Sequence, residues 1–499
     1  MVFSSLQFLY LFFPVTLVLY YSIFFIPKFG TKEIRINVSN LLLLVMSIIF
    51  YAAGEKIWVL ILLLSVSLNY YSALVIDRGI RINNNLIKRI GLVVSVLSNL
   101  SVLLYFKYST FLIENFNMLI LSSDQHYLKP IVFSPVALPL GISFYTFQSM
   151  SYNIDVYRGQ AQATKSLINF ACYITMFSQL VAGPIIRYRD ICVHLTNRFI
   201  DRSMFLHGVK RFTWGLSKKV LIANTLSIPV EQIFSLPDGQ LTFTVAWFGA
   251  ILYSLQIYYD FSGYSDMAIG IGRIFGFQFP ENFNYPYISK SIQDFWRRWH
   301  ISLSTWFKDY LYIPLGGNRI SAERTYLNLL IVFFLCGFWH GASWTFIAWG
   351  LYHGLFLIFE RIGPGKFFEN KGSIFGYCYA LPVIIIGWVI FRTENFTQAF
   401  YYISAMTGFS RYAEPSSVGI SMFLTTDILI ASLAGVIFSM PVYPSIEKGY
   451  EMFRSICKQN GFADALVTGF GYAILSSVFL YASILIASGR ENPFIYFRF

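Results

Sequence analysis

Charge is scarce in this sequence. Only 12% of its 499 residues are Asp, Glu, Lys or Arg, whereas 56% are hydrophobic and 19% are aromatic. A soluble domain averages about 25% charged and about 45–50% apolar residues. The composition therefore excludes an ordinary soluble domain and predicts a membrane protein.

Metal-binding patterns are also absent. The five cysteines form no CxxC pair and no even-numbered framework, which excludes a structural zinc site and a disulfide scaffold. No HExxH occurs, and His300, His340 and His353 lack the i, i+3 or i, i+4 spacing of ligands on one helix. The glycines of GIGRIFG have the wrong spacing for a dinucleotide fingerprint. The sequence therefore predicts no metal site and no tightly bound cofactor.

No internal repeat and no Gly/Ser-rich or Pro-rich linker divides the chain. We therefore expect a single membrane domain over residues 1–499. Residues 1–130 alternate apolar runs with short basic loops, residues 135–362 mix apolar and polar aromatic segments, and residues 370–499 return to plainer runs. Polar residues at membrane depth usually face a bundle interior or a water-filled cavity, so we place the catalytic core in the middle part.

Several apolar runs reach the length of about 17–25 residues that a membrane-crossing helix needs. Counting weaker runs, we expect an all-α, polytopic protein with about 10–13 membrane-embedded helices, some of them short, interfacial or re-entrant. The first run lacks the basic n-region and cleavage site of a secretory signal, so we expect it to be retained as a helix. The strongest runs are Leu6–Ile26, Ile57–Ile76, Ile90–Phe106, Ile374–Phe391, Phe423–Met440 and Ala465–Ser488.

Positive charge gathers in one segment. Ile186–Val220 holds eight Lys or Arg residues against two Asp residues, and the positive-inside rule predicts that it is a cytoplasmic loop. No nucleic-acid-binding motif accompanies this charge. We therefore expect anionic lipid headgroups beside it and no nucleic-acid partner.

The stretch YYDFSGYSDMAIGIGRIFG contains Asp260 and Asp266, which are separated by about 600° around an ideal helix. They do not share a face, which argues against a paired-carboxylate acid/base site. Gly263, Gly270 and Gly272 favour close packing between helices. Asp260 is left with two interpretations, a single buried structural carboxylate or a residue that lines a cavity.

A histidine stands at the end of an apolar run. His340 follows Leu327–Trp339 and precedes Gly341, which would leave space beside its ring. A histidine at membrane depth is a candidate functional residue. The alternative is a core histidine bonded to a neighbouring carbonyl, and the residues leave both open. If one helix carries His340 and His353, the two rings lie about 220° apart, so we expect them not to share a task.

Three stretches carry a family resemblance. QIYYDFSGYSDMAIGIGRIFGFQFPENFNYPY, DFWRRWHISLSTWFKDYLYIPLGGNR and WHGASWTFIAWGLYHG, in this order and spacing, closely resemble the membrane-bound O-acyltransferase (MBOAT) family, and within it the bacterial alginate O-acetyltransferase branch. The likeness runs from Val2 to Phe499.

The resemblance implies a fold in which membrane helices surround a central cavity or tunnel, in the bacterial cytoplasmic (inner) membrane. It implies that the catalytic residues are His340 and His300. It also implies that an acyl thioester such as acetyl-CoA enters from the cytoplasm as a co-substrate. The acyl group, acetyl by this branch, would be used to O-acetylate an extracytoplasmic polysaccharide, directly or through a partner acetyltransferase. The substrate-binding residues that we predict are Arg297, Arg298, Trp299, Trp339 and Asp260.

On this interpretation His340 acts as a general base on a hydroxyl. His300 binds or orients one reactant, or donates a hydrogen bond to the developing oxyanion. Arg297 and Arg298 are adjacent, hence about 100° apart on a helix, so we expect at most one to face the tunnel with His300. An arginine there could pair with phosphates of the acyl donor.

Three rival functions stay open at this stage. D-alanyl transfer to teichoic acid uses the same chemistry in the same larger family. A transporter would use the polar middle part as a permeation path, but its usual repeated halves with discontinuous helices are not visible. The third rival is a structural scaffold in a polysaccharide-export complex, a function that does not explain the histidines of the middle part.

Overall fold

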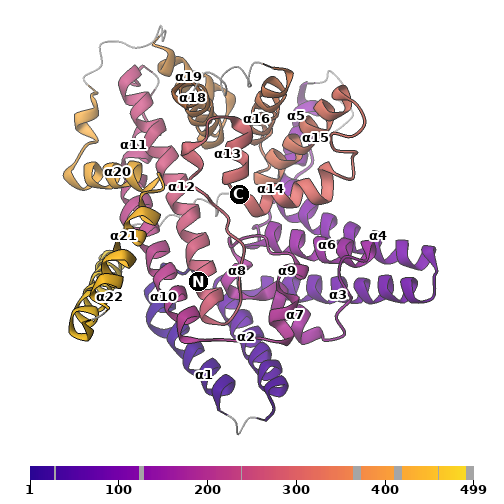
Figure 1. The fold of residues 1–499 in the computed structure, drawn as a ribbon. Helices are drawn as coiled ribbons and strands as arrows, with labels where there is room; N and C mark the ends of the chain where they lie inside the picture. The colour runs from indigo at the N-terminus through magenta and orange to yellow at the C-terminus, as the bar shows by residue number, and fades with distance from the viewer. Residues whose placement is uncertain are drawn as a thin grey trace.

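A computed structural model describes residues 1–26, 30–122, 129–237, 239–363, 373–408, 418–458 and 460–489. Throughout these ranges the chain forms helices joined by turns, without a strand (Figure 1). The prediction of an all-α fold is confirmed. The buried apolar residues form one continuous cluster that extends from Phe3 to Ala482.

The N-terminal part consists of long helices. These are the π-helical turn η1 (Phe8–Phe12), α1 (Phe13–Phe25), α2 (Lys32–Glu55), α3 (Val59–Arg81), α4 (Asn85–Leu103), the π-helical turn η4 (Leu104–Tyr108) and α5 (Ser109–Ser122).

Hydrogen bonds between buried amide side chains join two of these helices to the helix that follows α5. α3 and α4 lie side by side and pack on α6 (Ile142–Arg158) (Figure 1). Asn69 Oδ1 accepts hydrogen bonds from Asn99 Nδ2 at 2.8 Å, from Ser95 Oγ at 2.8 Å and from Asn153 Nδ2 at 3.1 Å. Such amide contacts join membrane helices where no hydrophobic force acts between them.

The middle part begins with α6 and continues through short helices to the 32-residue α12. After α6 come α7 (Leu167–Thr175), α8 (Phe177–Leu180), α9 (Tyr188–Thr196), α10 (Arg202–Ser217), η5 (Lys218–Ala223), α11 (Asn224–Phe234) and α12 (Phe243–Ile274). The predicted cytoplasmic loop Ile186–Val220 is thus largely helical. Its Arg198 and Lys219 are buried, because they fill the interfaces that this segment makes with its neighbours.

Glycines set the closest helix contact in this part. A Cβ on Gly263 would lie 2.7 Å from the carbonyl oxygen of Gly215, and one on Gly270 would lie 2.7 Å from that of Gly208. α10 and α12 therefore touch backbone to backbone, as the glycine pattern of the sequence predicted.

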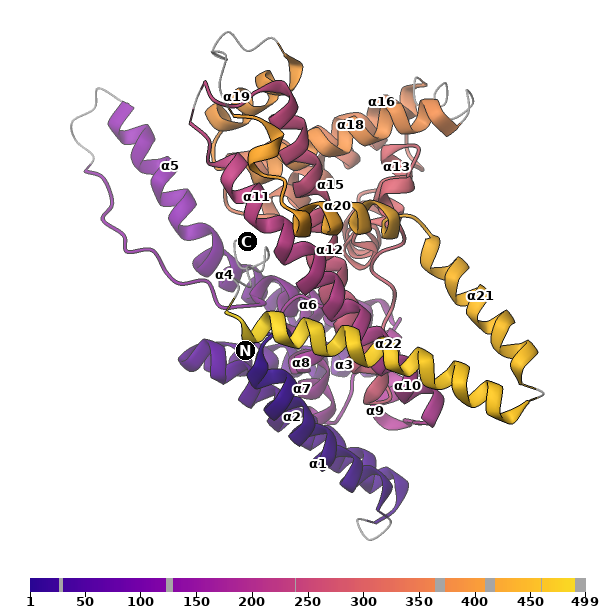
Figure 2. The ribbon, with the colours of Figure 1, turned by 90° about the vertical axis from the view of Figure 1, so that its left-hand side faces the viewer.

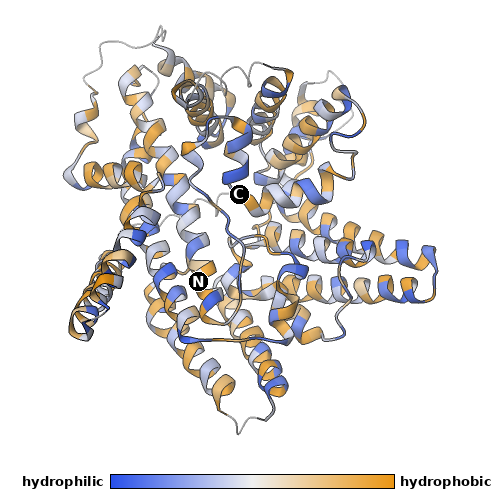
Figure 3. Ribbon diagram, viewed as in Figure 1, coloured by the Kyte–Doolittle hydropathy of each residue, from blue (hydrophilic) through white to orange (hydrophobic). Residues whose placement is uncertain are grey.

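The rest of the chain completes the bundle. Its elements are α13 (Ile292–Arg298), α14 (Ile301–Phe307), η7 (Lys308–Tyr312), α15 (Ala322–His340), α16 (Trp344–Ile362), α18 (Ser373–Arg392), α19 (Phe396–Thr407), α20 (Thr426–Phe438), α21 (Val442–Cys457) and α22 (Gly461–Ala487). α21 and α22 run along the outside (Figure 2). α1 and α22 are mostly hydrophobic along their length (Figure 3).

Six helical segments of the described ranges are long and apolar enough to cross a membrane, or up to seven if the bent pair α20 and α21 is one span. The protein is thus polytopic, as expected. The count of about 10–13 embedded helices stays a prediction, because it includes short and re-entrant ones. The run Phe423–Met440 forms only the 13-residue α20, which is too short to cross alone and meets α21 at a bend of 77°.

α4, η4 and α5 form one helical segment from Asn85 to Ser122. Its part from Asn85 to Lys107 is about 33 Å long, close to the thickness of a hydrocarbon core. At the Asn85 end, Lys88 Nζ lies 4.3 Å from the ring of Tyr157, at the end of α6. Arg158 donates to the carbonyl oxygen of Asp309, whose carboxylate pairs with two more arginines. We call this end the basic face, defined by Lys88, Arg158, Arg187 and Arg189, and the positive-inside rule predicts that it faces the cytoplasm.

Candidate active site

His340 is the last residue of α15, at a sharp break before α16. The two helices cross at glycines: a Cβ on Gly350 would lie 2.1 Å from the carbonyl oxygen of Phe333. A Cβ on Gly341 would lie 2.2 Å from the ring of Phe346. The space beside Gly341 is therefore filled by Phe346, and is not left open beside the histidine ring as the sequence suggested.

Aromatic rings surround the His340 side chain, which is only 3% exposed. The ring centroid lies 5.0 Å from that of Trp339, 5.0 Å from that of Trp349 and 5.4 Å from that of Phe391. The imidazole is thus enclosed in an apolar chamber that excludes bulk water. A low-dielectric site of this kind strengthens electrostatic interactions with a bound reactant.

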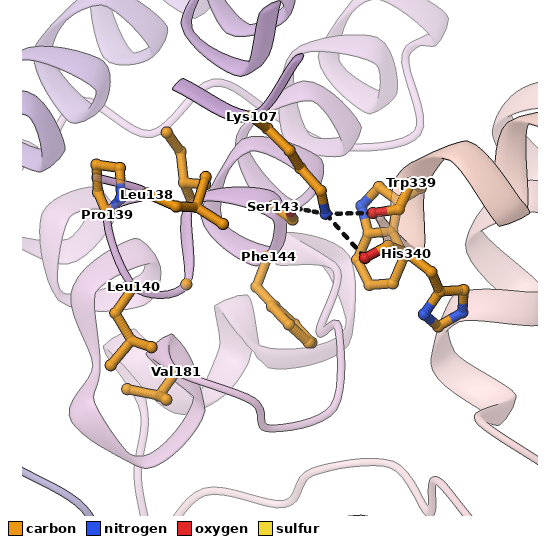
Figure 4. A pocket seen from close by; sticks show the side chains of 11 residues that line it. Lys107, Leu138, Pro139, Leu140, Ser143, Phe144, Val181, Trp339 and His340 are labelled. Carbon is orange, nitrogen blue, oxygen red and sulfur yellow. Dashed lines mark hydrogen bonds between the residues drawn. The ribbon is translucent and has the colours of Figure 1, made fainter. Parts of the chain in front are cut away.

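A pocket of about 490 Å³ reaches the backbone of His340. It is lined by the segment Leu138–Phe144 at the start of α6, together with Lys107, Val181 and Trp339. The imidazole of His340 points away from Lys107, with the Trp339 indole beside the lysine (Figure 4). Trp339 therefore stands between this pocket and the ring that we expect to react.

Lys107 anchors the end of α15. Its side chain is buried, and Nζ donates to Ser143 Oγ at 3.3 Å, to the His340 carbonyl oxygen at 3.3 Å and to the Trp339 carbonyl oxygen (Figure 4). The last carbonyls of a helix carry partial negative charge, which a lysine stabilises. The sequence analysis missed this residue. The signal was present, since a lysine inside the apolar run of α4 and α5 is costly at membrane depth.

His300 lies between α13 and α14 and is completely buried. Its φ of 43° is in the left-handed region, which a residue with a Cβ adopts rarely. Nδ1 lies 3.2 Å from Asn282 Oδ1, and the ring packs edge-on to Phe261 with centroids 4.6 Å apart. Burial lowers the pKa of His300 to about 3, so the ring is neutral at physiological pH.

The two predicted catalytic histidines approach each other across Trp339. The indole centroid lies 6.2 Å from the His300 ring and 5.0 Å from the His340 ring. Residues that are 40 positions apart in the sequence thus pack against the same tryptophan. Trp339, predicted as a substrate-binding residue, is a wall common to both rings.

His353 lies on α16 and not on the helix of His340, because the chain breaks at Gly341–Ser343. The premise that one helix carries both is therefore wrong. His353 packs against the same tryptophan as His340, with its ring 5.3 Å from Trp349. It also lies 5.3 Å from Trp296, so it belongs to the aromatic packing around the chamber.

The predicted arginines are separated from His300. Arg297 is exposed, and Arg298 is half-buried with Nε 2.9 Å from Asp294 Oδ1 on the same helix. Neither points into the chamber with His300, because the short α13 ends at Arg298 and the chain turns inward at Trp299. Trp299 itself is buried and packs on Trp388, with centroids 4.7 Å apart.

Asp260 forms a buried ion pair with Lys219 of η5, and both side chains are at most 2% exposed. Asp266, further along α12, pairs with Lys218 and Arg211 at 2.6 Å each. The two aspartates serve separate partners, as their spacing predicted. The contact seen for Asp260 is one between helices, and its predicted role in substrate binding stays a prediction.

Among the described residues no group of three or more His, Cys, Asp or Glu side chains is arranged to hold a metal ion. The site is instead composed of histidines, tryptophans and one lysine. A protein with this fold and site is a polytopic membrane protein whose candidate catalytic histidines are buried among aromatic rings.

Comparison with known proteins identifies the family. The model of the MBOAT, membrane-bound O-acyltransferase family, matches residues 86–363, and this chain belongs to that family. It is 40% identical to a probable alginate O-acetylase of Pseudomonas putida over the whole of both chains. It is 37% identical to a peptidoglycan O-acetyltransferase of Helicobacter pylori over 74% of each chain. A teichoic acid D-alanyltransferase of Bacillus subtilis is 30% identical over 44% of this chain and 58% of its own.

These relationships confirm the predicted family, the O-acyltransferase activity and the location as a multi-pass protein of the bacterial inner membrane. The family model covers His300 and His340. The assignment of individual site residues rests on the geometry described above.

Proposed function

We propose that this chain transfers an acetyl group from a cytoplasmic thioester for the O-acetylation of an extracytoplasmic polysaccharide, directly or through a partner acetyltransferase. The observation that carries the proposal is that the rings of His340 and His300 both pack against Trp339, a residue that also lines the neighbouring pocket. Relatives named as O-acetyltransferases match this chain over more of its length than the D-alanyltransferase does.

His340 acts as the general base. Its imidazole takes the proton of an acceptor hydroxyl while that oxygen attacks the thioester carbonyl carbon. The tetrahedral intermediate then collapses with cleavage of the C–S bond, and the thiolate leaves with the proton that His340 holds. General-base assistance of this kind is worth about 10²–10⁴-fold in rate.

His300 makes a hydrogen bond to one of the reactants within the same chamber. Its side chain is fully buried, and Nε2 has no hydrogen-bond partner among the described residues. A buried polar atom without a partner is costly, which supports a ligand atom as its partner in the working enzyme.

The acyl donor approaches from the basic face, and acetyl-CoA fits as the co-substrate. Arg298 donates to the carbonyl oxygen of Asn284. Three residues before Asn284, Glu281 pairs with Arg211 of the positively charged stretch Ile186–Val220. Arg297 beside it is exposed and is the candidate partner for the donor's phosphates.

The test uses membranes that contain the full chain and radiolabelled acetyl-CoA, with label measured in polymer or in a partner protein. His340→Ala should reduce transfer by about 10²-fold or more, and His300→Ala by a similar or smaller factor. His207→Ala is the matched control, because this histidine is exposed on α10. Normal transfer by well-expressed His340→Ala protein, or label accepted only from a D-alanyl-carrier thioester, would overturn the proposal.

A further inference from the structure

The amide of Asn282 has a fixed orientation. The backbone N–H of Ser302 lies 3.1 Å from Oδ1, and a backbone N–H can only donate, so the atom that it faces is the oxygen. On its other side Nδ2 donates to Ser265 Oγ on α12 at 3.0 Å. Ser302 Oγ also donates to Oδ1, at 2.9 Å. Asn282 therefore presents an acceptor oxygen towards His300.

This orientation fixes the tautomer of His300. Its Nδ1 lies 3.2 Å from Asn282 Oδ1, which accepts and cannot donate. A neutral imidazole carries its single proton on one nitrogen, so the proton is on Nδ1 and Nε2 keeps a lone pair. Burial lowers the pKa of His300 to about 3, which keeps the ring in this neutral form.

Asn282 also holds the backbone that positions the ring. Its carbonyl oxygen accepts from the N–H of Ile301 at 2.9 Å, while Oδ1 accepts from that of Ser302. These are first N–H groups of α14, which a helix cannot satisfy internally. The unfavourable left-handed φ of His300 is thereby held by a residue of another segment.

We propose that Asn282 is a positioning residue that fixes His300 as the Nδ1–H tautomer, so that Nε2 accepts a hydrogen bond from an O–H or N–H group of a reactant. This rests on the proposed function for the identity of the reactants. It also selects between the roles considered for His300. Nε2 accepts a hydrogen bond from a reactant and does not donate one to the oxyanion.

The first test reads the tautomer and does not depend on activity. In full-length protein labelled with 15N-histidine in lipid bilayers, NMR distinguishes a protonated from an unprotonated ring nitrogen, and His300→Gln identifies the His300 signals. We expect the Nδ1–H tautomer in the wild type and in Asn282→Asp, which keeps the acceptor oxygen. Asn282→Ala should convert His300 to the other tautomer or to a mixture.

Asn284→Ala is the matched control, because Asn284 lies two positions further along and is exposed. It should leave the His300 signals unchanged. An Nε2–H tautomer in the wild type would overturn the proposal, whatever the activity of the enzyme. So would unchanged His300 signals in Asn282→Ala, since Asn282 would then act only on the backbone.

The second test uses pH to distinguish whether Nε2 of His300 accepts or donates a hydrogen bond. A carboxylate in Asn282→Asp raises the pKa of His300, and below that pKa Nε2 is protonated and cannot accept. Charged or titratable groups lie on several elements around His300. They are His340 of α15, Asp260 of α12 paired with Lys219, Asp266 of α12 paired with Lys218 and Arg211, the residues Asp294, Arg297 and Arg298 of α13, and Glu281 beside Asn282. Because Asn282→Asp leaves these groups in place, the change reports His300.

As the pH is lowered, acetyl transfer by Asn282→Asp should therefore be lost at a higher pH than transfer by the wild type. Higher activity of this variant at low pH would mean that a protonated His300 donates, and would overturn the assignment. Partners that orient a histidine at metal sites are worth about 10–100-fold, and we expect Asn282→Ala to lose a similar factor in kcat/KM. Measuring KM separately for the thioester and for the acceptor identifies the reactant whose O–H or N–H group His300 binds.

Discussion

Lys107 Nζ donates a hydrogen bond of 3.3 Å to the carbonyl oxygen of His340, a residue 233 positions further along the chain. The contact joins the π-helical turn η4 to the end of α15 at the site itself. The carbonyl oxygen of Trp339 and Ser143 Oγ accept from the same ammonium group. Lys107 thus links the N-terminal helices to the end of α15 and to α6, and helps to set the position of both.

Replacing Lys107 by Met should displace the end of α15. Each buried acceptor that loses its donor costs about 1–3 kcal/mol, so the variant should have a lower Tm and lose acetyl transfer at least tenfold. Thermal unfolding in detergent and transfer from labelled acetyl-CoA measure the two effects. Arg89→Met, which removes an exposed cation from α4, is the control. Wild-type stability and activity in Lys107→Met would show that the anchor is dispensable.

Gly350→Ala should disturb the crossing of α15 and α16. The added Cβ would lie 2.1 Å from the backbone oxygen of Phe333, which cannot rotate away as a side chain can. Such overpacking costs about 1–3 kcal/mol and moves His340 relative to Trp349.

Gly469→Ala offers a control on α22, because its Cβ would meet nothing within 4 Å. There the higher helix propensity of Ala should add up to about 1 kcal/mol of stability. Thermal unfolding of the two variants should therefore move in opposite directions. Equal shifts would contradict the close contact at Gly350.

Asp260→Asn should destabilise the protein, because a buried ion pair that loses one partner costs about 3–5 kcal/mol. The double variant Asp260→Leu with Lys219→Met should recover much of this loss, since a buried pair replaced by apolar groups is often neutral. Unfolding midpoints test this. A stable double variant with full acetyl transfer would remove Asp260 from the predicted substrate-binding residues, whereas a stable but inactive one would support its inclusion.

Arg297→Gln should weaken binding of the thioester donor more than Arg298→Gln. Arg297 is exposed, whereas the guanidinium of Arg298 is already paired with Asp294. The KM for acetyl-CoA should rise in Arg297→Gln, and its dependence on salt should become weaker. Arg324→Gln removes an equal charge from the exposed start of α15 and serves as the control. Equal KM values in all three variants would argue against a phosphate contact at Arg297.

Local patterns predicted much of the fold. Apolar runs identified α1, α18 and α22, and the glycines of α12 predicted close packing against another helix, because both signals lie within a few helical turns. Only the structure showed that the partner is α10. The same reasoning failed at α20. An apolar run shows that a segment can be buried or embedded, but not where the helix bends.

Site residues were predicted with less success where they depend on distant partners. His340 was recognisable as a histidine at the end of an apolar run. Asn282 was not, since its amide gains meaning only when α12 and α14 bring Ser265, Ser302 and His300 around it. Arg297 and Arg298 adjoin His300 in sequence but lie outside the chamber, because a helix end separates them.

The sequence by itself determined that this is a helical membrane protein, predicted that its basic stretch Ile186–Val220 lies beside the cytoplasm, and identified the candidate histidines. Those properties follow from composition and short-range periodicity, which act on each segment independently. Only the tertiary structure decided that His300 and His340 pack against the same Trp339, and that Asn282 and Lys107 hold the segments that carry them. These contacts join residues up to 233 positions apart, and their geometry is set by the packing of helices that no local pattern describes.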